Sequence, residues 1–404
     1  MRFLLVLLLF ITSLYAELGY VANTLSNDVT VFDATTHAVV ATIPVGNQPV
    51  IPAIMPDRSK IYVTVATDGN LAVIEEATLT LVGTIPVGAT PIYVAITSDG
   101  ARAYVTHSTG IVSVIDTATD TVIATIPTPG ALEGLAITPN GLRVYPNDNG
   151  GNVFAIDTQT NAVIATIPVG GSAIESATTP DGSRIYVANQ GGNVDVIDVA
   201  TNTIATSIPT AGDPFGLNIT HDGSRVYTSL RSAGAVAVIS TASNTVLTTF
   251  PVGNNPEDIA FNLTGTQAFV VNSGDNTVSV IDIATNATIA TIPAGTFPQG
   301  IAVSALSLPT LNARGKGKKA TFLTETDIFN EIKWNPFNVV SGPTTYKIYR
   351  DASFTNLIDT IPPGASLRFE DHNLKRKTNY TYFIVAEVNG TPVNFEHITV
   401  RSSS

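Results

Sequence analysis

The feature that most constrains this chain is a pattern of 41 or 42 residues that occurs seven times. Each copy contains four short apolar or alternating segments, separated by turns rich in Gly, Asn, Asp and Thr, as expected for β-strands. A period of this length with four strands is typical of one blade of a β-propeller. The sequence therefore predicts an all-β fold, with a seven-bladed β-propeller over residues 17–305. Equivalent aromatic residues mark the copies at Tyr20, Tyr62, Tyr104, Tyr145, Tyr186, Tyr227 and Phe269.

The phase of the repeat predicts how the ring closes. The first copy begins at its second strand, near Tyr20, and has no innermost strand of its own. The last copy continues into residues 300–303, which read as an innermost strand with nothing after it. We expect these two ends of the repeat region to pair, because pairing removes the open sheet edges that would otherwise remain.

The recurring units resemble those of the YVTN-repeat β-propellers. They include Tyr-Val-Ala-Asn at 20–23 and 186–189, Ile-Pro-Val-Gly at 43–46, 85–88 and 167–170, and Pro-Asp-Gly at 180–182. That family occurs in exported bacterial proteins and in archaeal surface-layer proteins. The resemblance implies the propeller fold but no single function, since relatives include adhesins, nucleic-acid binders and haem-binding proteins.

The first 16 residues have the pattern of a secretory signal peptide. A basic residue, Arg2, precedes an apolar run over residues 3–11, and Ala16 is a small residue suited to cleavage. We therefore expect the mature chain to be secreted, periplasmic or displayed on the cell surface. The mature sequence has no apolar run of the roughly 20 residues that a transmembrane helix needs. It contains no cysteine, so disulfides and thiolate metal sites are excluded.

The repeat ends near residue 305, and a different pattern follows. Residues 306–319 include a basic, glycine-spaced segment that we interpret as a linker. Residues 320–404 alternate as strands and predict a small β-sandwich. Leu374, six residues before Tyr380, resembles the tyrosine corner of fibronectin type III modules, and Trp334 resembles their core tryptophan. This second resemblance implies a spacer or adhesion module and assigns no binding residue.

Four carboxylates are predicted to gather at one mouth of the propeller channel. In a propeller, ligands usually bind where the outermost strand of one blade leads into the innermost strand of the next. Alignment of these seven connections brings together Glu133, Glu175, Glu257 and Asp258, with the aromatic residues Tyr93 and Phe215. Carboxylates can bind a divalent cation such as Ca²⁺. The alternative, which we favour, is a hydrated acidic rim. No other cofactor is expected.

Other polar residues have simpler interpretations. Aspartates recur at one place in the blade and predict turn capping, because a catalytic residue is needed only once. The five histidines show no metal-binding spacing and are expected at the surface. Arginines recur before the second-strand aromatic and are interpreted as strand-surface charge: Arg102, Arg143, Arg184 and Arg225.

Three functions remain open after these observations. The first is a non-enzymatic binding, adhesion or scaffold protein whose loop face recognises a protein or an envelope or cell-surface ligand. The second is a cation-dependent, lactonase-like hydrolase at the channel mouth, for which no converging His, Asp and Arg set is found. The third is a nucleic-acid binder, against which the charge argues. Residues 310–404 have a net charge of +3, whereas the rest carries eight basic and 23 acidic residues and would repel phosphates. We therefore expect the first function.

Overall fold

The computed structural model describes residues 17–304 and, further along the chain, residues 314–321, 326–333, 344–350, 357–362, 368–372, 378–388 and 391–401. The chain divides into two units, Met1–Leu306 and Ser307–Ser404. The signal peptide predicted over residues 1–16 lies outside the described residues. So do residues 305–313, which include the first part of the predicted linker.

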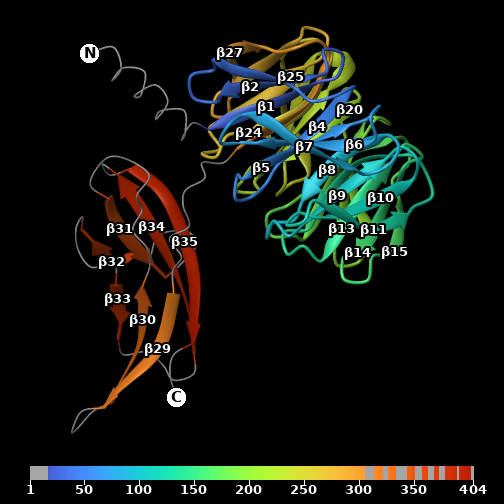
Figure 1. Cartoon of the computed structure of the whole chain (residues 1–404). Coiled ribbons are helices and arrows are strands. Elements are labelled where there is room, and N and C mark those ends of the chain that lie inside the picture. The colour runs from blue at the N-terminus through green and yellow to red at the C-terminus, as the bar shows by residue number, and fades with distance from the viewer. Residues whose placement is uncertain are drawn as a thin grey trace, which may run out of the picture. The chain divides into compact units, whose positions relative to one another are not determined.

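The first unit is a seven-bladed β-propeller, each blade being a four-stranded antiparallel sheet (Figure 1). From the channel outward, blade 1 contains β28 (Pro298–Val303), β1 (Leu18–Asn23), β2 (Asp28–Asp33) and β3 (Val39–Pro44). Blade 2 contains β4 (Pro49–Ile54), β5 (Lys60–Val65), β6 (Asn70–Glu75) and β7 (Thr80–Pro86). Blade 3 contains β8 (Pro91–Ile96), β9 (Arg102–His107), β10 (Ile111–Asp116) and β11 (Thr121–Pro127). Blade 4 contains β12 (Leu132–Ile137), β13 (Arg143–Asp148), β14 (Asn152–Asp157) and β15 (Ala162–Pro168).

The remaining three blades follow the same order. Blade 5 contains β16 (Ala173–Thr178), β17 (Arg184–Asn189), β18 (Asn193–Asp198) and β19 (Thr203–Pro209). Blade 6 contains β20 (Pro214–Ile219), β21 (Arg225–Leu230), β22 (Ala235–Ser240) and β23 (Thr245–Pro251), with a 3₁₀ turn, η2 (Arg231–Ala233), after β21. Blade 7 contains β24 (Pro256–Phe261), β25 (Gln267–Asn272), β26 (Thr277–Asp282) and β27 (Ala287–Pro293).

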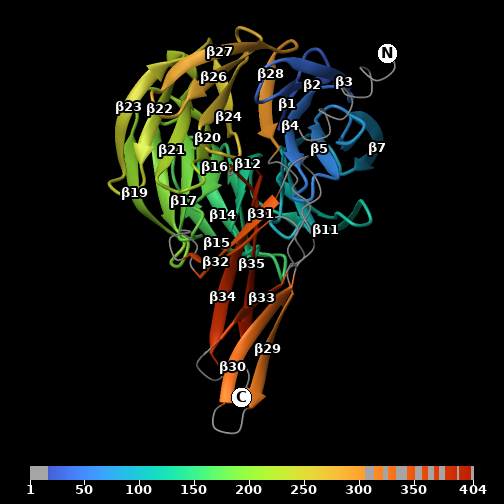
Figure 2. The ribbon, with the colours of Figure 1, turned by 90° about the vertical axis from the view of Figure 1, so that its left-hand side faces the viewer.

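The ring closes as the repeat phase predicts. Strand β28 pairs antiparallel with β1, with Ala302 opposite Tyr20 and Ile301 opposite Val21 (Figure 2). The backbone N–H of Ser304 donates to the carbonyl of Leu18 (2.7 Å), and the N–H of Leu18 donates to Ser304 Oγ (2.9 Å). The predicted pairing of the two ends of the repeat region is confirmed.

Apolar side chains fill the space between neighbouring blades. Between blades 5 and 6, for example, Tyr186 and Val196 pack with Leu217 and Val226. The middle strands are buried over most of their length because both faces of each blade contact a neighbour, whereas the outermost strands are largely exposed. The β-branched residues of the repeat suit these buried, pleated surfaces.

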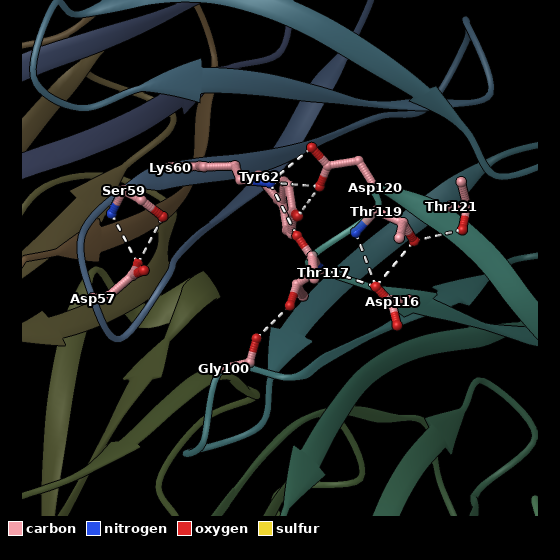
Figure 3. Close-up of polar contacts among 11 residues, drawn as sticks. Asp57, Ser59, Lys60, Tyr62, Gly100, Asp116, Thr117, Thr119, Asp120 and Thr121 are labelled. Atoms are coloured by element: carbon pink, nitrogen blue, oxygen red, sulfur yellow. Dashed lines mark hydrogen bonds and ion pairs between the residues drawn. The ribbon is translucent and has the colours of Figure 1, made fainter.

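Polar side chains also join neighbouring blades. Figure 3 shows one junction, where the Lys60 Nζ donates to the carbonyl of Thr117 (3.0 Å) and Tyr62 donates to Asp120. The equivalent arginines donate to carbonyls in the next blade at Thr158 (from Arg102, 2.8 Å), Val199 (from Arg143, 3.0 Å) and Thr241 (from Arg184, 3.2 Å). The sequence interpretation of these arginines as strand-surface charge did not include this contact, by which three of the four tie one blade to the next.

The recurring aspartates cap turns, as predicted. Asp198 Oδ1 accepts a hydrogen bond from the backbone N–H of Thr201 (2.8 Å), and Asp282 Oδ1 accepts one from Thr285 (2.8 Å). These bonds hold the turn between the third and fourth strands. The pKa of both carboxyls is lowered because hydrogen bonds stabilise the ionised form, chiefly from the backbone N–H of Thr201 for Asp198 and from the hydroxyl of Thr285 for Asp282.

The second unit is a small β-sandwich of two antiparallel sheets. One sheet has the order β29 (Arg314–Thr321), β30 (Thr326–Lys333) and β33 (Arg368–Asp371). The other has the order β32 (Leu357–Ile361), β31 (Thr344–Tyr349), β34 (Asn379–Val388) and β35 (Thr391–Arg401). Tyr382 of β34 donates to Asp371 of β33 (2.7 Å) and so links the two sheets.

Strand β29 differs from the sequence prediction. The basic segment that begins at Arg314 was expected to belong to a linker over residues 306–319, but it pairs with β30, Arg314 lying opposite Lys333. The second unit therefore begins its first strand before residue 320. No helix in the described part of the chain is long and apolar enough to cross a membrane.

Candidate binding site at the channel mouth

The candidate residues lie in β-bulges near the start of the innermost strands. In β24 the register shifts between Pro256 and Ile259, which places Glu257 and Asp258 in the bulge. Equivalent shifts occur in the other innermost strands, as at Glu175 in β16. A bulge redirects side chains and interrupts the regular ladder, and bulges are common beside functional sites.

The bulges leave some backbone N–H and C=O groups without a partner in the neighbouring strand. Hydroxyl groups from the second strands form hydrogen bonds with these groups instead. Ser229 Oγ accepts from the N–H of Gly216 (2.8 Å) and donates to the carbonyl of Glu257 in the next blade (2.6 Å). Thr64 Oγ1 likewise accepts from the N–H of Ile51 (3.0 Å) and donates to the carbonyl of Ile92 (2.9 Å). These bonds fix the bulges of adjacent blades relative to one another.

Three glycines lie where the innermost strands of adjacent blades approach each other closely. A Cβ on Gly216 would lie 2.1 Å from the carbonyl oxygen of Glu257, and one on Gly134 would lie 2.5 Å from that of Ile174. A Cβ on Gly300 would lie 2.5 Å from the carbonyl oxygen of Val50. Glycine therefore permits the close approach of adjacent inner strands in blades 4, 6 and 1. The equivalent position carries Ile51, Tyr93, Glu175 and Asp258 in blades 2, 3, 5 and 7, and the sequence analysis did not recognise why glycine occupies the other three.

All four predicted carboxylates line one cavity of about 80 Å³ at the channel mouth, together with Tyr93 and Phe215. The hydrated rim that we favoured is wrong for three of them. Glu175 and Asp258 are each 7% exposed and Glu257 is 1% exposed, while Glu133 is half-buried. Such burial requires hydrogen-bonding partners, which differ for each acid.

A chain of polar contacts crosses the channel between blades that are not neighbours. Tyr93 Oη of blade 3 donates to Glu175 Oε1 of blade 5 (2.9 Å), and the carboxyl of Glu175 hydrogen-bonds to that of Asp258 in blade 7. Asp258 Oδ2 accepts from the N–H of Ile301 in the closing strand (2.9 Å), and Oδ1 accepts from Ile259 (2.6 Å). Four innermost strands are thus joined through one pair of acids.

Burial keeps a proton on this pair. It raises the pKa of Asp258 to about 7, although two backbone donors act in the opposite direction. The pKa of Glu175 is raised well above its ordinary value, first by burial and then by the neighbouring Asp258. Two adjacent buried carboxyls cannot both ionise without a large repulsion, so one proton lies between them.

Glu257 is held by a cation from the neighbouring blade. Its Oε1 lies 2.9 Å from Arg231 Nη2 and accepts from Ser273 Oγ (2.6 Å), while Oε2 is buried and has no hydrogen-bond partner among the described residues. The Arg231 guanidinium stacks 4.5 Å from the ring centre of Phe215. The sequence analysis did not select Arg231, because it lies outside the aligned connections, in the turn after β21.

The fourth acid, Glu133, makes a separate contact. Its Oε1 accepts a hydrogen bond from Asn149 Nδ2 (2.5 Å), and burial raises the pKa of its carboxyl. Within the described residues, no three His, Cys, Asp or Glu side chains lie close enough to hold a metal ion. The structure brings only Glu175 and Asp258 together, and the cation site stays a prediction.

The three histidines of the propeller do not line this cavity. His107, expected at the surface, is fully buried at the end of β9, with Nδ1 3.0 Å from the carbonyl of Ala89 and Nε2 3.0 Å from Ser113 Oγ. Burial lowers the pKa of His107. His37 is half-buried and His221 is exposed, and both lie in turns.

Part of the chain matches the model of a known domain family. Residues 57–211, within blades 2 to 5, match DUF5074. This family is described only as a domain of unknown function, and the match covers less than half of the chain. No curated protein matches the sequence.

Two solved structures share the propeller fold. A Kuenenia stuttgartiensis hydrazine synthase structure has a TM-score of 0.61 and 22% identity, over 66% of this chain and 92% of that one. A functionally unknown protein from Desulfotomaculum acetoxidans DSM 771 has a TM-score of 0.65 and 22% identity, over 72% of this chain and 99% of that one. At this identity the likeness shows the fold alone.

The arrangement at the mouth is suited to recognition. Its walls are apolar or aromatic, at Val50, Ile51, Ile92, Ile174, Phe215 and Tyr93. Carboxyl groups at fixed positions interrupt these walls. A few fixed polar groups on an apolar wall are characteristic of ligand sites.

Proposed function

We propose that this chain is an exported, non-enzymatic binding protein. In this proposal it recognises a partner through the propeller face that surrounds the channel mouth, which we call the mouth face. The partner is a protein or another envelope or cell-surface ligand, and it presents a basic group to the mouth. Export rests on the signal-peptide pattern of residues 1–16.

The observation that carries the proposal is the acidic cavity itself. Its small volume of about 80 Å³ admits one side chain or a small group, so a larger partner would rest on the surrounding connections. Glu133 is the most exposed of the four acids, and the propeller side of the chain has a net charge of −15. Such a surface attracts basic partners and speeds their association.

The second unit fits a supporting role in this proposal. We propose that it is a fibronectin type III-like spacer and that the propeller is of the YVTN-repeat type. The strand order of the two sheets and the seven repeat copies support these assignments. The hydrolase and nucleic-acid alternatives have no observation of their own among the described residues, so the binding role is the one we propose.

Capture experiments with matched variants test this function. Mature protein is immobilised and exposed to envelope fractions of the producing cells, and bound proteins are identified by mass spectrometry. We compare wild type with Glu133→Lys, which reverses the charge at the mouth, and with Leu142→Lys, which places a lysine on the opposite face and changes the net charge by one unit instead of two. The proposal expects a partner held by wild type and Leu142→Lys, released by salt and lost with Glu133→Lys. Equal capture by Glu133→Lys would contradict it.

A further inference from the structure

The outer rim of the propeller carries exposed apolar side chains at one repeated position. In blade 3 these are Val122 and Ile123, which are 37% and 50% exposed. They lie at a β-bulge, where the pairing of β10 with β11 shifts register. Equivalent bulges occur in the outermost strands of all seven blades.

The outermost strands contain no charged residue. Their sequences are VVATIP, TLVGTIP, TVIATIP, AVIATIP, TIATSIP, TVLTTFP and ATIATIP. Edge strands usually carry lysine or other charges that keep them from associating, and here the bulge and the final proline are the only such devices. The rim is therefore an uncharged belt on an acidic protein.

Blades 1 to 4 and blade 6 each expose two large apolar side chains at this position, and blades 1 to 3 form one part of the belt. Strand β7 lies beside β3 on one side and β11 on the other. Together they expose six large apolar side chains, which define the rim patch: Val39, Val40, Leu81, Val82, Val122 and Ile123. Blade 5 exposes only Ile204 at this position and blade 7 only Ile289, so the belt does not have sevenfold symmetry. Exposed apolar side chains gathered on neighbouring strands make this part of the rim a candidate interaction site.

We propose that the rim patch is a contact surface between two copies of this chain. Each copy has a net charge of −12, so acidic faces of two copies repel. The uncharged rim is a surface on which two identical acidic propellers can meet without opposing like charges. A two-fold contact brings the same patch of both copies together, and the apolar side chains of this patch bring no like charges into that contact.

Side-chain packing, rather than strand addition, would hold this contact. The bulge disrupts the outer edge of each strand near its start, and Pro127 and its equivalents cannot donate a hydrogen bond at its end. The exposed Val, Leu and Ile side chains instead offer apolar area whose burial stabilises association.

Sedimentation velocity of the full mature chain over a range of concentrations tests the proposal. We expect wild type to associate reversibly, and association to strengthen with salt because salt screens the repulsion between acidic bodies. The double variant Val82→Lys with Ile123→Lys should weaken association by about tenfold or more, because it places buried, unpaired charges in the contact.

A matched control keeps the same change of net charge. Leu142→Lys with Leu263→Lys alters two exposed apolar residues in turns at the opposite face and should associate as wild type does. If the lysine variant does not fold, Val82→Thr with Ile123→Thr replaces it, because threonine retains strand preference. This variant should also show weakened association. A wild type that stays monomeric throughout would overturn the proposal, whether or not it binds lipid vesicles or another protein. Equal weakening by both lysine pairs would also overturn it.

Discussion

Tyr93 donates a hydrogen bond of 2.9 Å to Glu175 across the channel mouth, and so joins blade 3 to blade 5 without involving the blade between them. Glu175 in turn contacts Asp258, which holds the closing strand through the N–H of Ile301. The buried acids therefore have a structural role in addition to the recognition that we propose.

The stability of the propeller should depend on the proton shared by Glu175 and Asp258. Burial raises the pKa of Asp258 to about 7, and that of Glu175 is raised as well, so the folded state binds protons more tightly than the unfolded state. The pair's contribution is complete below the unfolded pKa values of about 4 and is lost as pH rises through about 7. Chemical unfolding of wild type and Glu175→Gln should show a smaller loss in the variant across this window. An identical pH dependence in the two proteins would show that the Glu175–Asp258 pair does not cause the loss of stability.

Glycine at the channel should be required for close packing of the inner strands. Gly216→Ala places a Cβ 2.1 Å from the Glu257 carbonyl oxygen and should lower the free energy of unfolding by about 1–3 kcal/mol. Gly83→Ala, in the outer strand β7, meets no heavy atom within 4 Å among the described residues and should be neutral or slightly stabilising. Urea denaturation of both variants checks this. Equal effects would show that inner-strand contact does not limit stability.

Equivalent tyrosines should contribute differently to the free energy of unfolding, because only some of their hydroxyls form a hydrogen bond to the next blade. Tyr186 Oη donates to Asn244 Oδ1 (2.7 Å), so Tyr186→Phe should cost about 1 kcal/mol. The buried hydroxyl of Tyr104 has no hydrogen-bond partner among the described residues, and Tyr104→Phe should be neutral or stabilising. The two melting temperatures are compared in one buffer. A larger loss with Tyr104→Phe would contradict the described junctions.

The cation prediction is tested by thermal melts with and without millimolar Ca²⁺ or Mg²⁺. Glu133 contacts Asn149, Glu257 contacts Arg231, and the remaining two acids share a proton. We therefore expect no specific rise in melting temperature. A rise that disappears in Glu175→Gln would instead establish a cation site, because a ligand that binds only the folded state stabilises it.

Much of the architecture follows from the repeat. The seven copies predict the number of blades, the phase of the repeat predicts the pairing of β28 with β1, and alignment of the connections brings the four acids to one mouth. The depth and direction of each side chain could not be predicted, because a bulge breaks the alternation by which strand residues are assigned to a face. That is why Glu257, 1% exposed, was expected in a hydrated rim.

Long-range contacts also escape sequence reasoning. The guanidinium of Arg143 reaches Val199 in the next blade, a contact that no local spacing indicates. In β29 the glycines between basic residues favoured a flexible linker, yet the same alternation suits an extended strand paired with β30. Both cases depend on partners that are distant in the sequence.

Photo-crosslinking in the producing cells tests the central claim most directly. A photoreactive amino acid replaces Ile174, which lines the mouth, or Leu142 on the opposite face, and crosslinked proteins are identified by mass spectrometry. We expect Ile174 to crosslink to a distinct partner protein or envelope component and Leu142 to give none. Crosslinks from Leu142 but not from Ile174 would contradict the assignment of the mouth face as the binding surface.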